Sequence, residues 1–134
     1  MLTKDADLKK LLTETKTIAV VGASPKPWRD SGAISEFLNK KGYKVFPVNP
    51  KYQEVLGMKC YPNLKSIPEK IDMVDIFRNP DEVGAVIDEA IVVGAKSVWM
   101  QLGVVNETAA STAEKAGLSV VMDRCIAIDH RALM

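Results

Sequence analysis

Histidine and cysteine are scarce in this chain, which has one His and two Cys among its 134 residues. Cys60 and Cys125 lie far apart, with no C-x-x-C spacing and with His130 as the only imidazole. Zinc sites and disulfide frameworks both need several such groups at short spacing, so the sequence encodes neither. We expect no metal, and two reduced thiols in a cytoplasmic protein.

The chain also lacks an excess of charge of one sign. It has 18 Lys and Arg residues and 17 Asp and Glu residues, which gives a net charge of +1. Proteins that bind DNA or RNA carry a basic patch, so we expect no nucleic-acid partner. No apolar run approaches the roughly 20 residues of a membrane span, so we expect no membrane partner. The length predicts a single domain over residues 1–134.

Short apolar runs alternate with amphipathic segments along the chain. Strands are expected at 18–21, 44–48, 73–77, 97–100 and 118–122, and helices at 5–14, 31–41, from Asn79-Pro80 to Gly94, and at 107–116. Residues 51–70 are irregular, and a short apolar tail follows Cys125. This alternation predicts an α/β, Rossmann-like three-layer fold. Its five-stranded parallel sheet would have the strand order 3-2-1-4-5 and helices on both faces.

The first strand runs into a turn at Gly22, where a dinucleotide-binding fingerprint would begin. Ser24 stands at the place of the second glycine of that fingerprint and Pro27 at the place of the third, so the fingerprint is incomplete. Two interpretations are open. Gly22 either lets backbone N–H groups approach a phosphate, or only allows the chain to turn from strand to helix.

Cationic side chains follow the predicted strands at the edge where α/β sheets bind ligands. They are Lys26, Arg29, Lys51, Arg78 and Arg124. This group favours an anionic ligand. Sites for NAD usually place Asp or Glu after the second strand, where this chain has Asn49-Pro50-Lys51. A lysine attracts a ribose phosphate, so the sequence favours NADP or coenzyme A (CoA) over NAD.

Five segments together resemble the small stand-alone CoA-binding proteins, which are similar to the amino-terminal domain of the succinyl-CoA synthetase alpha subunit. The segments are 20–24 with Pro27 and Arg29, 48–51, 77–80, 99–103 and 121–125. The resemblance covers almost the whole chain and implies CoA as the ligand. The synthetase forms a phosphohistidine in a second domain and uses a separate nucleotide-grasping subunit, and this chain contains neither. Ligase activity is therefore not expected.

The resemblance also implies roles for individual residues at the strand ends. The CoA phosphates would be held by the first loop, through Gly22, Ala23, Ser24, Lys26 and Arg29. Asn49 and Lys51 would flank the ribose-phosphate end, and Phe77, Arg78, Asn79 and Pro80 would line the adenine side. Gln101 and Gly103, after the fourth strand, complete the candidate set.

Few other residues offer chemistry. Cys125 follows the cationic Arg124, which can activate a thiol, so it is either a partner for the CoA thiol or a structural residue. His130 is expected at the surface and Trp99 in the core. Asp75 lies in an apolar strand, and its role is open.

The leading hypothesis is a non-catalytic module that binds CoA or a short acyl-CoA, as a carrier, a sensor or a partner subunit. We expect no catalysis from the isolated chain. The alternatives are an NADP-dependent, oxidoreductase-like protein and a structural α/β subunit without a ligand. The sequence leaves open whether the chain has a protein partner or forms a homo-oligomer.

Overall fold

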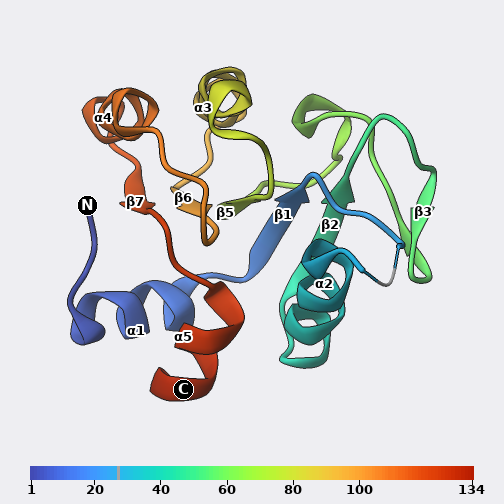
Figure 1. Ribbon diagram of the computed structural model, residues 1–134, viewed down its shortest axis with the longest axis horizontal. Helices are drawn as coiled ribbons and strands as arrows, with labels where there is room; N and C mark the ends of the chain where they lie inside the picture. Colours follow the sequence, from blue (N-terminus) through green and yellow to red (C-terminus); the bar gives the residue numbers. More distant parts are fainter. Residues whose placement is uncertain (27) are drawn as a thin grey trace.

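The computed structural model describes residues 1–26 and 28–134, so Pro27 lies outside the described residues. A parallel sheet lies between two layers of helices (Figure 1). Its strands are β1 (Thr17–Val21), β2 (Lys44–Val48), β5 (Met73–Ile76), β6 (Ser97–Met100) and β7 (Ser119–Val121). The helices are α1 (Asp5–Glu14), α2 (Asp30–Lys40), α3 (Val83–Val92), α4 (Glu107–Lys115) and α5 (Ile126–Leu133). The predicted α/β, Rossmann-like class is confirmed.

The strand order in the sheet is β2-β1-β5-β6-β7. The order expected from the sequence, 3-2-1-4-5, placed the third strand at the edge of the sheet, next to the second. The third of the predicted strands is β5, and it pairs with β1 instead, from Ile18 opposite Met73 to Val21 opposite Ile76. In both arrangements the order reverses beside β1. The point at which α/β sheets bind ligands therefore lies at the carboxyl end of β1, as expected.

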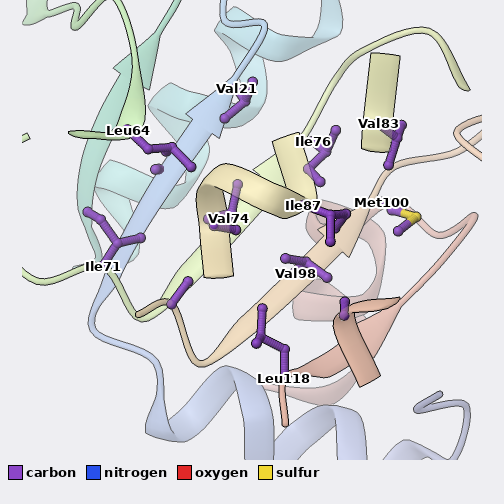
Figure 2. Packing of buried hydrophobic residues seen from close by; sticks show 14 of the residues in the cluster. Val21, Leu64, Ile71, Val74, Ile76, Val83, Ile87, Val98, Met100 and Leu118 are labelled. Atoms are coloured by element: carbon purple, nitrogen blue, oxygen red, sulfur yellow. The ribbon is translucent and has the colours of Figure 1, made fainter. Parts of the chain in front are cut away.

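The connection from β2 to β5 explains the observed order. It contains a hairpin of β3 (Glu54–Val55) and β4 (Met58–Lys59) and a short 3-10 helix, η1 (Leu64–Ser66). Leu64, Ile67 and Ile71 from this connection are buried in one cluster with strand residues such as Val21 and Val74 (Figure 2). Because these side chains are buried against the sheet, the connection covers it in place of a helix and leads the chain to the far side of β1.

Two apolar layers hold the helices against the sheet. Ala19 and Val21 of β1 face the layer that contains α3 and α4, whereas Ile18 and Val20 face the layer that contains α1, α2 and α5 (Figure 1). Burial on both faces explains why the strands are continuous apolar runs rather than alternating ones. Within the described ranges, no helix is both long enough and apolar enough to cross a membrane.

The segment after Cys125, expected as a short apolar tail, forms the helix α5. Ile126, His130 and Leu133 of α5 recur at the i, i+4, i+7 spacing of one helix face. Ile126 and Leu133 belong to or pack against the apolar layer that contains α1 and α2. Trp99 is fully buried in the same layer, as predicted, and its indole N–H donates to the Arg124 carbonyl at 2.8 Å.

Candidate functional site

A polar pocket of about 640 Å³ lies past the carboxyl ends of β1, β2 and β5. Loops that follow these three strands supply most of its wall. The lining residues are Ser24, Lys26, Arg29, Asn49, Lys51, Tyr52, Phe77, Arg78, Asn79, Glu82 and Val104. Eight of the residues proposed from the sequence are thus brought together at the point where the strand order reverses.

The pocket carries four cationic side chains, Lys26, Arg29, Lys51 and Arg78. None of the four has a carboxylate within ion-pair distance in residues 1–26 and 28–134. Glu82 is the one acidic residue of the described lining. Like charges held together without counter-charges repel one another, so this arrangement favours a ligand that carries several negative charges.

Gly22 is required by the way the first loop packs. Its φ is +90°, and a Cβ at this position would overlap the carbonyl oxygen of Phe77. Its N–H donates to the carbonyl of Val48 at 2.9 Å, so this donor is not free for a phosphate. Gly22 does not line the polar pocket. The structure therefore supports the turn interpretation for this residue.

Ser24 shapes the loop after β1 from a buried position. Its backbone N–H donates to Ser31 Oγ at 3.1 Å, and its own Oγ accepts from the backbone N–H of Lys26 at 3.2 Å. A Cβ on Gly32 would overlap the Ser24 carbonyl oxygen. The start of α2 therefore lies directly against the loop, and Gly32 is a residue of the site's framework that sequence reasoning missed.

Asn49 connects the loops after β1 and β2. Its Nδ2 donates to the Ala23 carbonyl at 3.0 Å, and its Oδ1 accepts from the backbone N–H of Lys51 at 3.0 Å. The residue is 7% exposed. Asn49 thus uses both ends of its amide to fix the backbone that carries Lys51 at the pocket.

A second pocket of about 400 Å³ adjoins the first, because Phe77 and Val104 line both. Most of its wall is apolar. The remaining lining residues are Asp30, Ala33, Ile34, Phe37, Gln101, Leu102, Cys125, Ala127, Ile128 and Arg131. A cationic pocket and a mostly apolar pocket therefore meet at the same two side chains.

Four of the residues proposed from the sequence line neither pocket: Gly22, Ala23, Pro80 and Gly103. The Pro80 carbonyl accepts from Asn106 Nδ2 at 2.8 Å, and the Gly103 N–H donates to Asp123 Oδ1 at 2.8 Å. These groups hold loops to one another. Tyr52 and Val104, in contrast, line the polar pocket and were not anticipated, since neither follows directly after a strand.

Arg124 lines neither of the two pockets, although the sequence placed it among the rim cations. Its guanidinium donates two hydrogen bonds to the Asp129 carboxylate, at 2.7 and 3.0 Å. Those hydrogen bonds raise the pKa of Arg124. Arg124 is thus committed to holding the start of α5, and the activation of Cys125 expected from its charge has no support.

His130 is buried, at 8% exposure, and the prediction of a surface position was wrong. Its ring meets Phe37 and Tyr43 edge-on, with centroids 5.5 and 5.8 Å apart. Burial, with a smaller effect of Lys41, lowers the pKa of His130. The neutral imidazole therefore behaves as an aromatic packing residue of α5.

Asp75 is fully buried in β5, where its register neighbours are Val20 and Trp99. Neither carboxylate oxygen has a hydrogen-bond partner among the described residues. Burial raises the pKa of Asp75 well above its ordinary value. Burial thus favours the protonated form of the side chain, which lines neither of the two pockets.

A cationic pocket at the point of strand reversal is typical of nucleotide-binding domains of the Rossmann-like class. Comparison with protein families makes this more specific. The model of the CoA binding domain family matches residues 16–131 of the chain. The protein belongs to this family.

Relatives of similar length share nearly the whole chain. A Bacillus subtilis protein, YneT, is 39% identical over 125 residues, which are 93% of each protein. A solved structure of a hypothetical protein from Pyrococcus horikoshii is 46% identical and superposes with a TM-score of 0.95 over 98% of this chain and 92% of that one.

Longer relatives contain the domain as one part. An ADP-forming acetate–CoA ligase of Archaeoglobus fulgidus is 31% identical over 121 residues, which are 83% of this chain and 18% of the ligase. The apo structure of a dinucleotide-forming acetyl-CoA synthetase of Ca. Korarchaeum cryptofilum is 30% identical, with a TM-score of 0.73 over 87% of this chain and 28% of that one. The chain thus corresponds to a small part of these enzymes.

Proposed function

We propose that the two adjoining pockets bind CoA, with its phosphates in the polar pocket and its pantetheine arm in the apolar one. The observation that carries the proposal is the group of four cations without carboxylate partners, counted over the described residues. CoA carries a pyrophosphate and a 3′-phosphate on its ribose. Lys51, positioned by Asn49 after β2, is the residue we assign to the 3′-phosphate.

The apolar wall of the second pocket favours CoA over NADP, although both ligands carry a ribose phosphate. Past its phosphates CoA continues as a thin, uncharged arm of methyl and methylene groups with one hydroxyl and two amides, whereas NADP continues as a polar, positively charged nicotinamide riboside. Ile34, Phe37 and Ile128 give the adjoining pocket an apolar wall. Such a wall stabilises the pantetheine arm by removing apolar surface from water.

We further propose that the chain acts by binding, as a carrier, a sensor or a partner subunit. The acetate–CoA ligase relatives are longer proteins, of which this chain covers between 9% and 27%. The proposal is therefore limited to the recognition of CoA or a short acyl-CoA.

Isothermal titration calorimetry with CoA and with NADP tests the proposal. A well-formed charge-assisted contact contributes about 1.5 to 3 kcal/mol, so both ligands gain from the cations. Burial of the pantetheine arm adds a gain that NADP lacks, and we expect CoA to bind at least about tenfold more tightly. NADP binding as tightly as CoA, or an absence of CoA binding, would overturn the assignment.

A further inference from the structure

We propose that Cys125 forms a mixed disulfide with CoA, so that the protein carries CoA covalently under oxidising conditions. This inference rests on the proposed function, because it needs the pantetheine arm in the apolar pocket. Cys125 is half-buried and lines that pocket. The pocket adjoins the cationic one through Phe77 and Val104, so an arm that starts at the phosphates passes these two residues before it reaches the thiol.

Gln101 gives an independent sign that the apolar pocket receives a ligand with amide groups. The residue lines the pocket and is only 4% exposed. Its Oε1 accepts from the backbone N–H of Ile126 at 3.2 Å, which fixes the side chain next to Cys125. Its Nε2 donates to no described residue and is not one of the buried atoms without a partner, so it is open to solvent at the pocket that Gln101 lines. The pantetheine arm contains two amide carbonyls, and either can accept a hydrogen bond from this amide.

Two apolar side chains of the second pocket are exposed to solvent. Leu102 and Ile128 line it and are 61% and 56% exposed. The apolar part of a pantetheine arm would bury part of both side chains. The two exposed side chains, the free amide of Gln101 and the thiol of Cys125 thus all face the same pocket, and the thiol end of CoA is the group that suits the cysteine.

The second thiol of the protein is placed differently. Cys60 is buried, and its Sγ contacts the carbonyl oxygens of Asn49 and Tyr61 at 3.5 and 3.9 Å. Burial raises the pKa of the Cys60 thiol, and Cys60 lines neither the polar nor the apolar pocket. Cys60 is therefore the matched internal control for Cys125.

The reaction is a thiol–disulfide exchange with the symmetric disulfide of CoA. The thiolate of Cys125 attacks one sulfur of that disulfide. A bond between Cys125 and the attacked CoA sulfur forms, the bond between the two CoA sulfurs breaks, and the second CoA leaves as a thiolate that takes up a proton. One disulfide is consumed and one is formed, so the CoA disulfide is itself the oxidant. Reduced CoA or another thiol reverses the step.

Intact-protein mass spectrometry after incubation with CoA disulfide tests the inference. We expect one CoA adduct on the wild type and on Cys60→Ser, no adduct on Cys125→Ser, and loss of the adduct on reduction. Peptide mapping of the wild-type adduct locates the modified cysteine without relying on a variant. The disulfide of pantetheine lacks the phosphates, so at equal micromolar concentration we expect it to react about a hundredfold more slowly, because binding raises the local concentration of CoA disulfide to the millimolar range.

The outcomes separate the inference from the proposed function. If calorimetry shows CoA binding but no adduct forms, or Cys60 is modified as readily as Cys125, the inference is overturned and the proposed function stands. If the two disulfides react equally fast and calorimetry shows no CoA binding, the proposed function fails together with the inference.

Discussion

The side-chain amide of Asn49 donates a 3.0 Å hydrogen bond to the carbonyl oxygen of Ala23 and so ties the loop after β2 to the loop after β1. The two loops carry the polar pocket's lysines, Lys26 on one and Lys51 on the other. Because the strands that precede them are paired directly, one short side chain suffices to hold both loops. Asn49 is buried and offers little surface to a ligand, so we expect it to act on the pocket by holding the two loops together.

We expect Asn49→Ala to weaken both folding and CoA binding. The substitution leaves the buried Ala23 carbonyl and the Lys51 N–H without partners, which costs about 1 to 3 kcal/mol of unfolding free energy. Urea denaturation and calorimetry measure the two effects. Asn63→Ala is the control, because Asn63 caps η1 through the N–H of Ser66 at an exposed site outside both pockets. If both variants lose CoA affinity equally, Asn49 has no special role in the pocket.

We expect Gly22→Ala to destabilise the protein more than Gly42→Ala. Both glycines have positive φ, near +90° and +97°, so both substitutions incur the backbone cost of roughly 1 to 2 kcal/mol. A Cβ on Gly22 also overlaps the Phe77 carbonyl oxygen, whereas a Cβ on Gly42 has no atom within 4 Å. Thermal denaturation of the two variants isolates the contribution of that overlap. Equal losses of stability would show that the loop relaxes away from Phe77.

We expect Asp75 to make the protein less stable as pH rises. The pKa of Asp75 is raised in the folded state, so above the unfolded-state pKa of about 4 the folded protein holds a proton that the unfolded chain has released. Stability therefore falls by up to about 1.4 kcal/mol per pH unit until the folded-state pKa is reached. Urea denaturation between pH 5 and pH 8 measures this slope.

Asp75→Asn should remove that part of the pH dependence, because the amide stays neutral in both states. Asp88→Asn in α3 is the control, since Asp88 lies at an exposed position of the helix. A slope that is the same in Asp75→Asn and in the wild type would mean that the Asp75 carboxylate is charged in the folded protein.

The sheet and most of the helices could be predicted because each has a signal within its own stretch of sequence. Apolar runs buried on both faces mark the strands, and Asn106, which accepts from the N–H of Ala109, marks the start of α4. The strand order could not be predicted in this way. It depends on where Leu64 and Ile71 of an irregular connection are buried, and that is a property of the packed sheet.

The candidate site could be predicted in part from the rule that α/β sheets bind ligands at the carboxyl ends of their strands. That rule brought Lys51 and Arg78 to one pocket, but it also selected Arg124, whose partner Asp129 lies in a helix that the sequence did not reveal. It missed Gly32, since tight packing between a helix and a loop leaves no periodic signal. The spacing of Ile126 and Leu133 would have indicated α5.

The affinity for CoA compared with that for 3′-dephospho-CoA, measured by calorimetry, tests the central claim most directly. We predict that the wild type prefers CoA by about ten- to hundredfold, which corresponds to one charge-assisted contact of about 1.5 to 3 kcal/mol. Lys51→Ala should abolish the preference, whereas Lys65→Ala, which removes the same charge outside the polar pocket, should retain it. Equal affinities for both ligands in the wild type, or a preference that survives in Lys51→Ala, would contradict the account.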